Sequence, residues 1–132
     1  MLRLISFAML STALTLAPAA QAFEADNGVG VDAAQGDILV TGDAGQGARG
    51  MWCAAADYAR DVLGAAGYQR LYVAVARSPG LGQRAPVLFT TDAAGLDPAP
   101  VFLVGASLAR AGSSLSVDHA LGFCRDARGA GS

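Results

Sequence analysis

The sequence contains no lysine, one glutamate and one histidine, and these shortages remove classes of function. Residues 23–132 carry eight arginines against eleven acidic residues, a net charge of −3. Because nucleic-acid backbones are bound by basic surfaces, this balance excludes a nucleic-acid partner. A zinc site usually takes four Cys or His ligands, and this chain offers two cysteines and His119. We therefore predict no metal and no cofactor.

The chain also lacks an apolar run long enough to span a membrane, which takes about 20 residues. The longest run, Leu4–Leu16, is interrupted by serines and threonines. Arg3 precedes it and Ala20-Gln21-Ala22 follows it, which is the order of charge, apolar core and small-residue cleavage site in a secretory leader. We predict a signal peptide at residues 1–22, cleaved after Ala22, and no stable membrane anchor after cleavage.

Only two cysteines are present, Cys53 and Cys124. In an exported chain, two cysteines are most simply a disulfide, and both fall on the apolar sides of predicted helices. A reactive thiol and half of a metal site are the alternatives. The predicted disulfide agrees with a periplasmic or secreted localisation.

The composition divides the exported part in two. Residues 23–50 contain seven glycines and five acidic residues against Arg49, with few large apolar side chains. Such a segment buries too little surface to offset its ordering entropy. We predict a flexible acidic segment over 23–50, with one possible short strand at Asp37–Thr41, and an α+β domain over 51–132.

The domain opens with a helix and a hairpin. Apolar residues recur every three or four positions over 51–65, which predicts an amphipathic helix that Gly64 and Gly67 end. Alternating residues then predict strands at Gln69–Arg77 and Val87–Thr91, paired as an antiparallel hairpin.

A third strand and a closing helix complete the predicted fold. The apolar run Val101–Arg110 predicts the strand, and Ser116 is placed to cap the helix that follows. The fold class is α+β, in the order helix, strand, strand, strand, helix. We expect a three-stranded antiparallel sheet with the two disulfide-linked helices on one face.

The region from about residue 50 to 126 resembles small exported bacterial proteins of unknown function that share a Trp-Cys helix start and a closing Phe-Cys. The residues that carry the resemblance are Trp52-Cys53, Ala56-Asp57-Tyr58-Ala59, Leu115-Ser116-Val117 and Phe123-Cys124. This resemblance implies no particular activity.

Gly45, Gly47 and Gly50 form a G-x-G-x-x-G pattern between a possible strand and a helix. In dinucleotide-binding proteins such a loop lets the pyrophosphate approach backbone N–H groups at a helix N-terminus. The chain is short for that fold, and Arg77 stands where an acid that binds the ribose would be expected. A chance match in a glycine-rich segment is the other explanation.

Two other groups of residues resemble known sites only in part. Residues 27–32 match one turn of a glycine-aspartate calcium repeat, but a single copy does not form the stacked site, so a solvated linker is the simpler interpretation. Asp57 and Asp61, one helical turn apart with Arg60 between them, indicate a solvated helix face.

Ser116, Asp118 and His119 are the residue types of a catalytic triad. As neighbours at the start of a helix, however, they point in different directions, and Ser116 is explained as a cap. We therefore predict no catalytic residues.

These features favour an exported, non-enzymatic interaction or binding module of the bacterial envelope, with an unknown protein or peptide as its partner. The alternative is a minimal dinucleotide-binding oxidoreductase that uses the Gly45, Gly47 and Gly50 loop. A third possibility is a peptide or protease-inhibitory binder that presents the loop 78–85.

Overall fold

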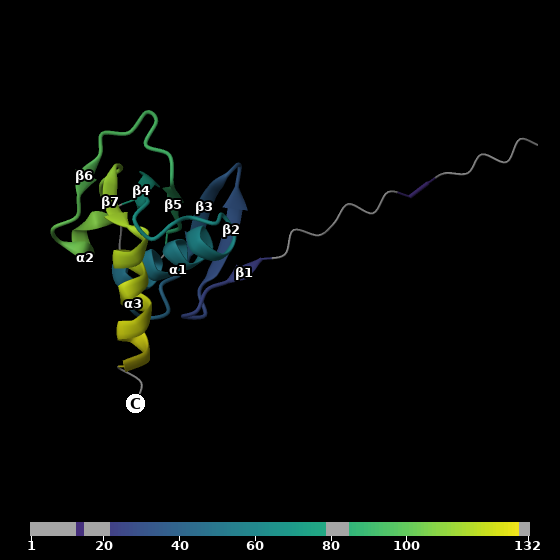
Figure 1. Cartoon of the computed structure of the whole chain (residues 1–132), viewed down its shortest axis with the longest axis horizontal. Helices are drawn as coiled ribbons and strands as arrows, with labels where there is room; N and C mark the ends of the chain where they lie inside the picture. The colour runs from purple at the N-terminus through teal and green to yellow at the C-terminus, as the bar shows by residue number, and fades with distance from the viewer. Residues whose placement is uncertain (1–12, 15–21, 79–84, 130–132) are drawn as a thin grey trace, which may run out of the picture.

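The computed structural model describes residues 13–14, 22–78 and 85–129, and within them seven strands form one mixed sheet (Figure 1). The spatial order is β1-β2-β3-β5-β4-β7-β6. Neighbouring strands are antiparallel except β6 and β7, which are parallel. The strands are β1 (Phe23–Glu24), β2 (Gly30–Ala34), β3 (Asp37–Thr41), β4 (Arg70–Val75), β5 (Val87–Thr90), β6 (Ala99–Pro100) and β7 (Ser113–Ser116).

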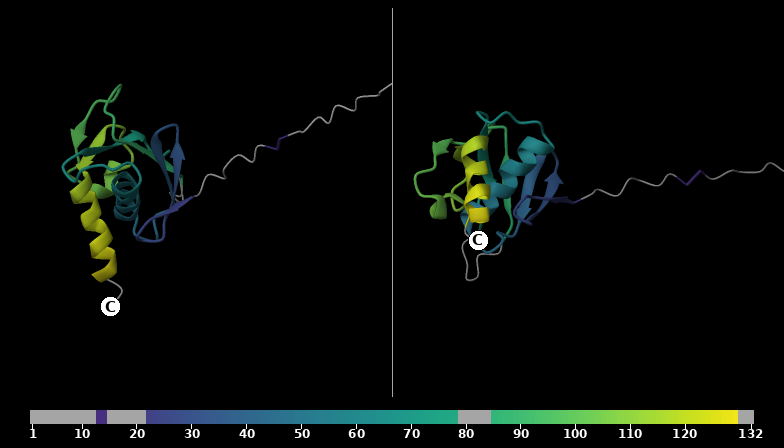
Figure 2. Two further views of the ribbon diagram at one scale, coloured as in Figure 1. Left: turned by 45° about the vertical axis from the view of Figure 1, so that its right-hand side comes forward. Right: turned by 60° about the horizontal axis from the view of Figure 1, so that its bottom comes forward.

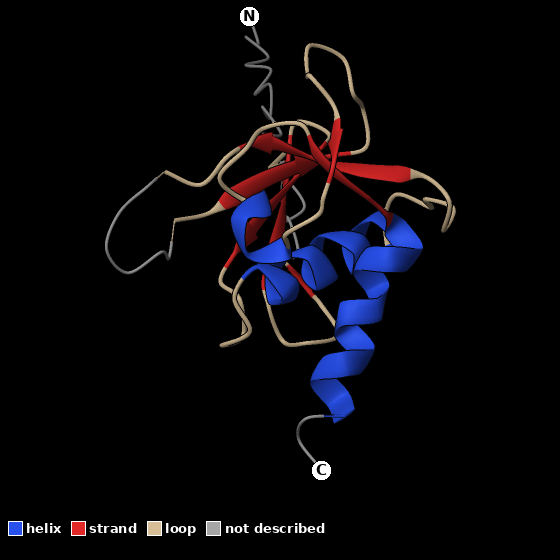
Figure 3. Cartoon of the chain, turned by 90° about the vertical axis from the view of Figure 1, so that its left-hand side faces the viewer, coloured by secondary structure: helices blue, strands red, loops and turns tan. Residues whose placement is uncertain are grey.

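Helices α1 (Ala48–Asp61) and α3 (Val117–Gly129) lie side by side on one side of this sheet (Figures 2 and 3). A short helix, α2 (Val104–Ser107), lies between β6 and β7 in the chain. The α+β class and the disulfide-linked helix pair are therefore confirmed. The predicted three-stranded antiparallel sheet is wrong, because the sheet has seven strands and one parallel pair.

Helix α1 is the centre of the core, and ten consecutive residues of it, Gly50 to Ala59, are buried. Many of these side chains are alanine, so the sheet and α3 approach the helix closely from two sides. Trp52 fills the space toward the sheet, with its ring centroid 4.9 Å from that of Phe89 in β5. The helix begins three residues before the predicted 51–65 and ends four residues earlier, with Gly64 at φ +68° beyond its end.

The prediction that residues 23–50 form a flexible segment is wrong, because β1, β2 and β3 lie within this range. Val31 in β2 and Ile38 and Val40 in β3 are fully or almost fully buried and alternate with neighbours that are more exposed. Gln35 and Gly36, at φ +53° and +90°, form the tight turn that joins these two strands. A few large side chains, all placed on one face, are enough to dock this hairpin on α1. The possible strand at Asp37–Thr41 is confirmed with the same bounds.

The predicted strand Val101–Arg110 is also wrong, because β6 ends at Pro100 and α2 occupies Val104–Ser107. Apolarity without alternation misled the prediction: Phe102 and Leu103 are 88% and 75% exposed, so this run does not form a buried strand. The predicted hairpin is confirmed as β4 and β5, which are antiparallel neighbours and slightly shorter than expected.

No helix among the described residues is long and apolar enough to cross a membrane. The predicted signal peptide, 1–22, lies outside those residues except for residues 13–14 and Ala22.

Candidate functional site

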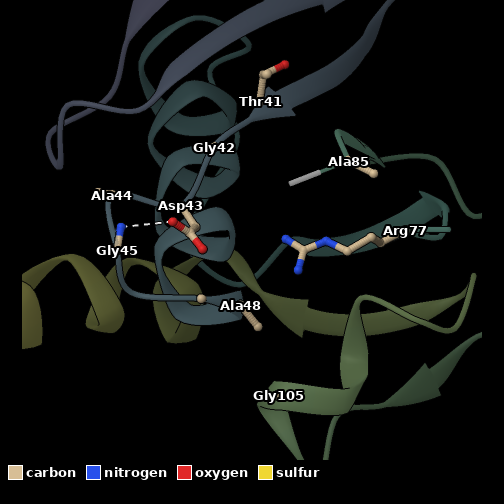
Figure 4. Close-up of a pocket in the computed structure, with 10 residues that line it drawn as sticks. Thr41, Gly42, Asp43, Ala44, Gly45, Ala48, Arg77, Ala85 and Gly105 are labelled. Carbon is tan, nitrogen blue, oxygen red and sulfur yellow. Dashed lines mark hydrogen bonds between the residues drawn. The ribbon is translucent and has the colours of Figure 1, made fainter. Parts of the chain in front are cut away.

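A cavity of about 800 Å³ opens where β3 and β4 end and α1 begins (Figure 4). Strands β3 and β4 are each antiparallel to β5, which lies between them, so they run parallel to each other. Helix α1 connects them along the chain, so their carboxyl ends and the start of α1 meet at one edge, where α/β units commonly bind ligands. The lining residues are Thr41, Gly42, Asp43, Ala44, Gly45, Gly47, Ala48, Arg77, Ala85 and Gly105.

The loop between β3 and α1 supplies half of the described lining residues, and the backbone conformation and packing of this loop explain its glycines. Gly45 and Gly47 have φ of +74° and +61°, in the left-handed region that favours glycine. Gly50 lies in the first turn of α1, where a Cβ would overlap the carbonyl oxygen of Asp43. The three glycines of the predicted motif are therefore explained by the turn and by the packing of the helix against it.

The surroundings of this loop differ from those of a dinucleotide-binding fold. In that fold the strands on either side of the connecting helix are parallel members of a doubly wound sheet. Here the antiparallel β5 separates β3 from β4, and Arg77 follows the end of β4. The strand, loop and helix order matches the motif, whereas the sheet around it does not.

Two charged side chains of opposite sign point into the cavity (Figure 4). The Asp43 carboxylate is oriented by the Gly45 N–H, which donates to Oδ1 over 2.8 Å. Arg77 is held at its backbone by a 2.7 Å hydrogen bond from its N–H to the Leu108 carbonyl, and its side chain donates to the Met51 sulfur. Among the described lining residues, the cavity therefore combines the cation of Arg77, the anion of Asp43 and a wall of backbone.

Helix α2 contributes Gly105 to the opposite wall, and a buried hydrogen bond joins α2 to α1. The indole Nε1–H of Trp52 donates to Ser107 Oγ over 2.8 Å, and that hydroxyl donates to the Val104 carbonyl over 2.6 Å. Trp52 and Ser107 are both buried. This hydrogen bond therefore helps to position Gly105.

The predicted disulfide between Cys53 and Cys124 is present, with the Cα atoms 5.1 Å apart. Both cysteines are buried, so the bond belongs to the α1–α3 contact and not to the cavity.

The prediction of a solvated helix face is wrong for Asp57, because this residue is 3% exposed. Its carboxylate accepts 2.7 Å and 2.6 Å hydrogen bonds from the Asp26 N–H and from Arg60 Nη2. Burial raises the pKa of Asp57 above its ordinary 3.8, against the lowering effect of the Asp26 N–H. Asp61 is exposed, and its hydrogen bond from Arg60 lowers its pKa. No sequence signal pointed to Asp26 as the partner that would bury Asp57.

The residues of triad type are used structurally. Ser116 Oγ accepts the His119 N–H over 3.1 Å, which confirms the predicted cap. The His119 ring lies against Phe123 with 5.7 Å between centroids, and the Asp118 N–H donates to the Gly67 carbonyl.

Two other predicted segments have different outcomes. Asn27, in the stretch that resembles a calcium repeat, uses its side chain to bond the Gly50 carbonyl and the Val29 N–H. Of the loop 78–85, residues 79–84 lie outside the described part of the chain, whereas Ala85 lines the cavity.

The resemblance to small exported bacterial proteins stays a prediction. Comparison with known proteins finds no match: no family model fits the chain, and neither a curated protein nor a solved structure is similar to it.

Proposed function

We propose that this protein is an exported, non-enzymatic binding module of the bacterial envelope, which binds a short peptide in the cavity between the β3–α1 loop and α2. The observation that carries this proposal is the placement of Arg77 and Asp43 in one cavity of about 800 Å³. Ligand cavities are commonly about 300 to 1,000 Å³, so the size fits a few peptide residues. A guanidinium suits a peptide carboxylate, and a carboxylate suits a peptide ammonium.

The leader pattern of residues 1–22 and the disulfide support export. Disulfides persist mainly in oxidising compartments, and Cys53 and Cys124 are bonded to each other. The protein is expected in the periplasm or secreted from the cell.

The chemistry of the cavity supports binding without catalysis. Its lining combines glycines and alanines with Thr41, Asp43 and Arg77. A nucleophile of the serine or cysteine type needs a neighbouring base, and the described lining residues do not include a histidine. What they offer is charge recognition against a backbone wall.

The first test combines native mass spectrometry with a cavity-filling variant. The mature protein is incubated with a mixture of tripeptides, and the tightest binder is then titrated by calorimetry. A Cβ at Gly105 meets no atom within 4 Å, so Gly105→Trp has room at its Cβ and should place an indole in the cavity, and binding should be lost. The matched control is Gly122→Trp on α3, where a Cβ meets only the end of Arg125 at 3.8 Å. Equal binding by both variants, or none by the wild type, contradicts the proposal.

Two peptide arms and one substitution test the charges separately. Amidating the peptide carboxyl end removes the partner of Arg77, and acetylating the amino end removes the partner of Asp43. Each loss of a charge-assisted hydrogen bond weakens binding by about 1.5 to 3 kcal/mol. Arg77→Gln should reduce the affinity for the free peptide and abolish the difference between the free and amidated peptides.

The alternative function, a dinucleotide-binding oxidoreductase, is tested by titrating the same proteins with nicotinamide dinucleotides. Saturable dinucleotide binding that Gly105→Trp abolishes and Gly122→Trp retains would favour that alternative over the peptide.

A further inference from the structure

The bond predicted to be cut when the leader is removed, Ala22–Phe23, directly precedes β1 (Figure 1). In β1, Phe23 pairs with Val31 and Glu24 pairs with Gly30, at one edge of the sheet. Residues on the carboxyl side of this bond are therefore part of the fold, with no linker between the bond and the sheet.

Residues 23–29, here called the N-terminal strap, are also fastened to α1. The Phe23 ring packs edge-on against Tyr58, with 5.3 Å between centroids. The Asp26 N–H donates to the buried carboxylate of Asp57 over 2.7 Å. Asn27 adds a 2.9 Å hydrogen bond from its side chain to the carbonyl of Gly50. Three contacts spread along the strap thus end on one helix.

We propose that Ala22–Phe23 is a processing site open to a leader peptidase only while the N-terminal strap is off the domain, so that cleavage precedes closure of the fold. This inference rests on the exported state assigned under the proposed function. Hydrolysis adds one water across the bond, which leaves a carboxylate on Ala22 and an amino group on Phe23. A peptidase must take the residues around the bond as an extended chain in its own cleft. Phe23 and Glu24 cannot enter that cleft while they are paired with β2.

The rate of cleavage of the folded chain then follows the fraction of molecules with an open strap. Variants that weaken the strap contacts from the α1 side raise this fraction and leave the sequence around the bond unchanged. Tyr58→Ala removes the ring under Phe23, and Asp57→Ala removes the acceptor for the Asp26 N–H.

The experiment uses the full chain with its leader, oxidised and folded, mixed with a bacterial signal peptidase in detergent micelles. Intact mass reports the cut. The folded wild type is cut slowly, and Tyr58→Ala and Asp57→Ala are each cut at least several-fold faster. Tyr68→Ala is the matched control, because Tyr68 is 85% exposed, and it is cut at the wild-type rate. The same full chain diluted from urea into the peptidase is cut fast, to a product that starts at Phe23.

The outcomes separate this inference from the proposed function. If the folded wild type is cut as fast as the chain diluted from urea, the strap does not protect the bond and the inference is wrong. If the chain diluted from urea is not cut, or is cut elsewhere, the prediction of a leader at residues 1–22 is wrong, and the proposed export loses its support. Asp57→Asn keeps a side-chain oxygen for the Asp26 N–H and covers the case in which Tyr58→Ala does not fold. It should be cut more slowly than Asp57→Ala, and a rate equal to that of Asp57→Ala would overturn the part assigned to Asp57.

Discussion

At the scale of single residues, Asp57 shows how a short sequence pattern misleads. Asp57, Arg60 and Asp61 have the spacing of an exposed helical ion-pair cluster, and Arg60 does bond both carboxylates. The N-terminal strap nevertheless covers Asp57 and leaves Asp61 exposed. Helical spacing predicts which residues share a face, but it does not predict what covers that face.

The burial of Asp57 gives the stability of the protein a pH dependence of known sign. The unfolded chain releases this proton near pH 3.8, whereas the folded chain holds it to a higher pH. Between the two pKa values the unfolded state binds fewer protons than the folded state. The contribution of Asp57 to the stability of the fold is therefore fully present below pH 3.8 and is lost as the pH rises through the pKa of the folded state.

Asp57→Asn should remove this loss. Urea unfolding of both proteins from below pH 3.8 to neutral pH should show the free energy of the wild type falling relative to that of the variant. The exposed Asp61 works in the opposite sense, because its pKa is lowered, and its main partner, Arg60, is present in both proteins. A constant difference across this range would contradict the assignment.

Gly50 carries a second prediction at this scale. A Cβ there overlaps the Asp43 carbonyl, so Gly50→Ala must shift the β3–α1 loop or the helix. Overpacking of this kind costs about 1 to 3 kcal/mol of unfolding free energy. Gly105→Ala is the control, since its Cβ meets open space, and it should leave the melting temperature unchanged or slightly higher. Equal melting temperatures for the two variants would show that the loop yields without cost.

At the scale of elements, the predicted and observed structures differ where local pattern and burial disagree. The helix at α1, the β4–β5 hairpin and the strand Asp37–Thr41 could be predicted from local apolar spacing. Strands β3 and β4 bury alternate residues, as that spacing predicts, whereas α1 is buried without a gap from Gly50 to Ala59. Strand β2 was missed, since three of its five residues are glycine or alanine and only Val31 is large. Such a strand forms because β3 and α1 supply the partners.

The candidate site could be predicted only in part from the sequence, because some of its residues are brought together by the tertiary structure. The glycine pattern indicated the β3–α1 loop, which lines the cavity. Arg77 and Gly105 enter from elements far along the chain, and the region around Gly105 was predicted to be a strand. Their approach to the loop depends on the sheet order and on the Trp52–Ser107 contact, neither of which leaves a local signal.

Helix α2 has four residues, so its position should depend on its anchor more than on helix propensity. Ser107→Ala leaves the buried indole N–H of Trp52 without its acceptor, which costs about 1 to 3 kcal/mol. Trp52 is the single tryptophan, so its fluorescence during urea unfolding reports both the stability and a local change around the indole. Ser78→Ala, at an exposed position, is the control. An unchanged emission spectrum and midpoint for Ser107→Ala would mean that another contact holds α2.

At the scale of the whole molecule, the disulfide and the N-terminal strap fasten different parts of the chain to α1. The disulfide fastens α3, and the strap fastens the first strands. The bond joins α1 to α3 across 71 residues, a loop that contains β4 to β7. Strands β1 to β3 lie outside this loop, and they are held by the pairing of β3 with β5 and by the contacts of the N-terminal strap with α1. Helix α1 is the element common to both closures, which explains why it is buried along most of its length.

Replacing both cysteines, as Cys53→Ala with Cys124→Ala, tests the first closure. For a closed loop of this length the chain-entropy model assigns the bond about 4 kcal/mol of stability, a large part of the total for a domain of this size. The double variant should therefore unfold at a much lower urea concentration than the oxidised wild type. The reduced wild type should resemble the variant once unfolding has exposed its sulfurs. Without denaturant, the buried bond should resist reductant, which alkylation and mass measurement would show. A loss far below this value would mean that the alanine-rich contact between α1 and α3 holds the domain together without the covalent bond.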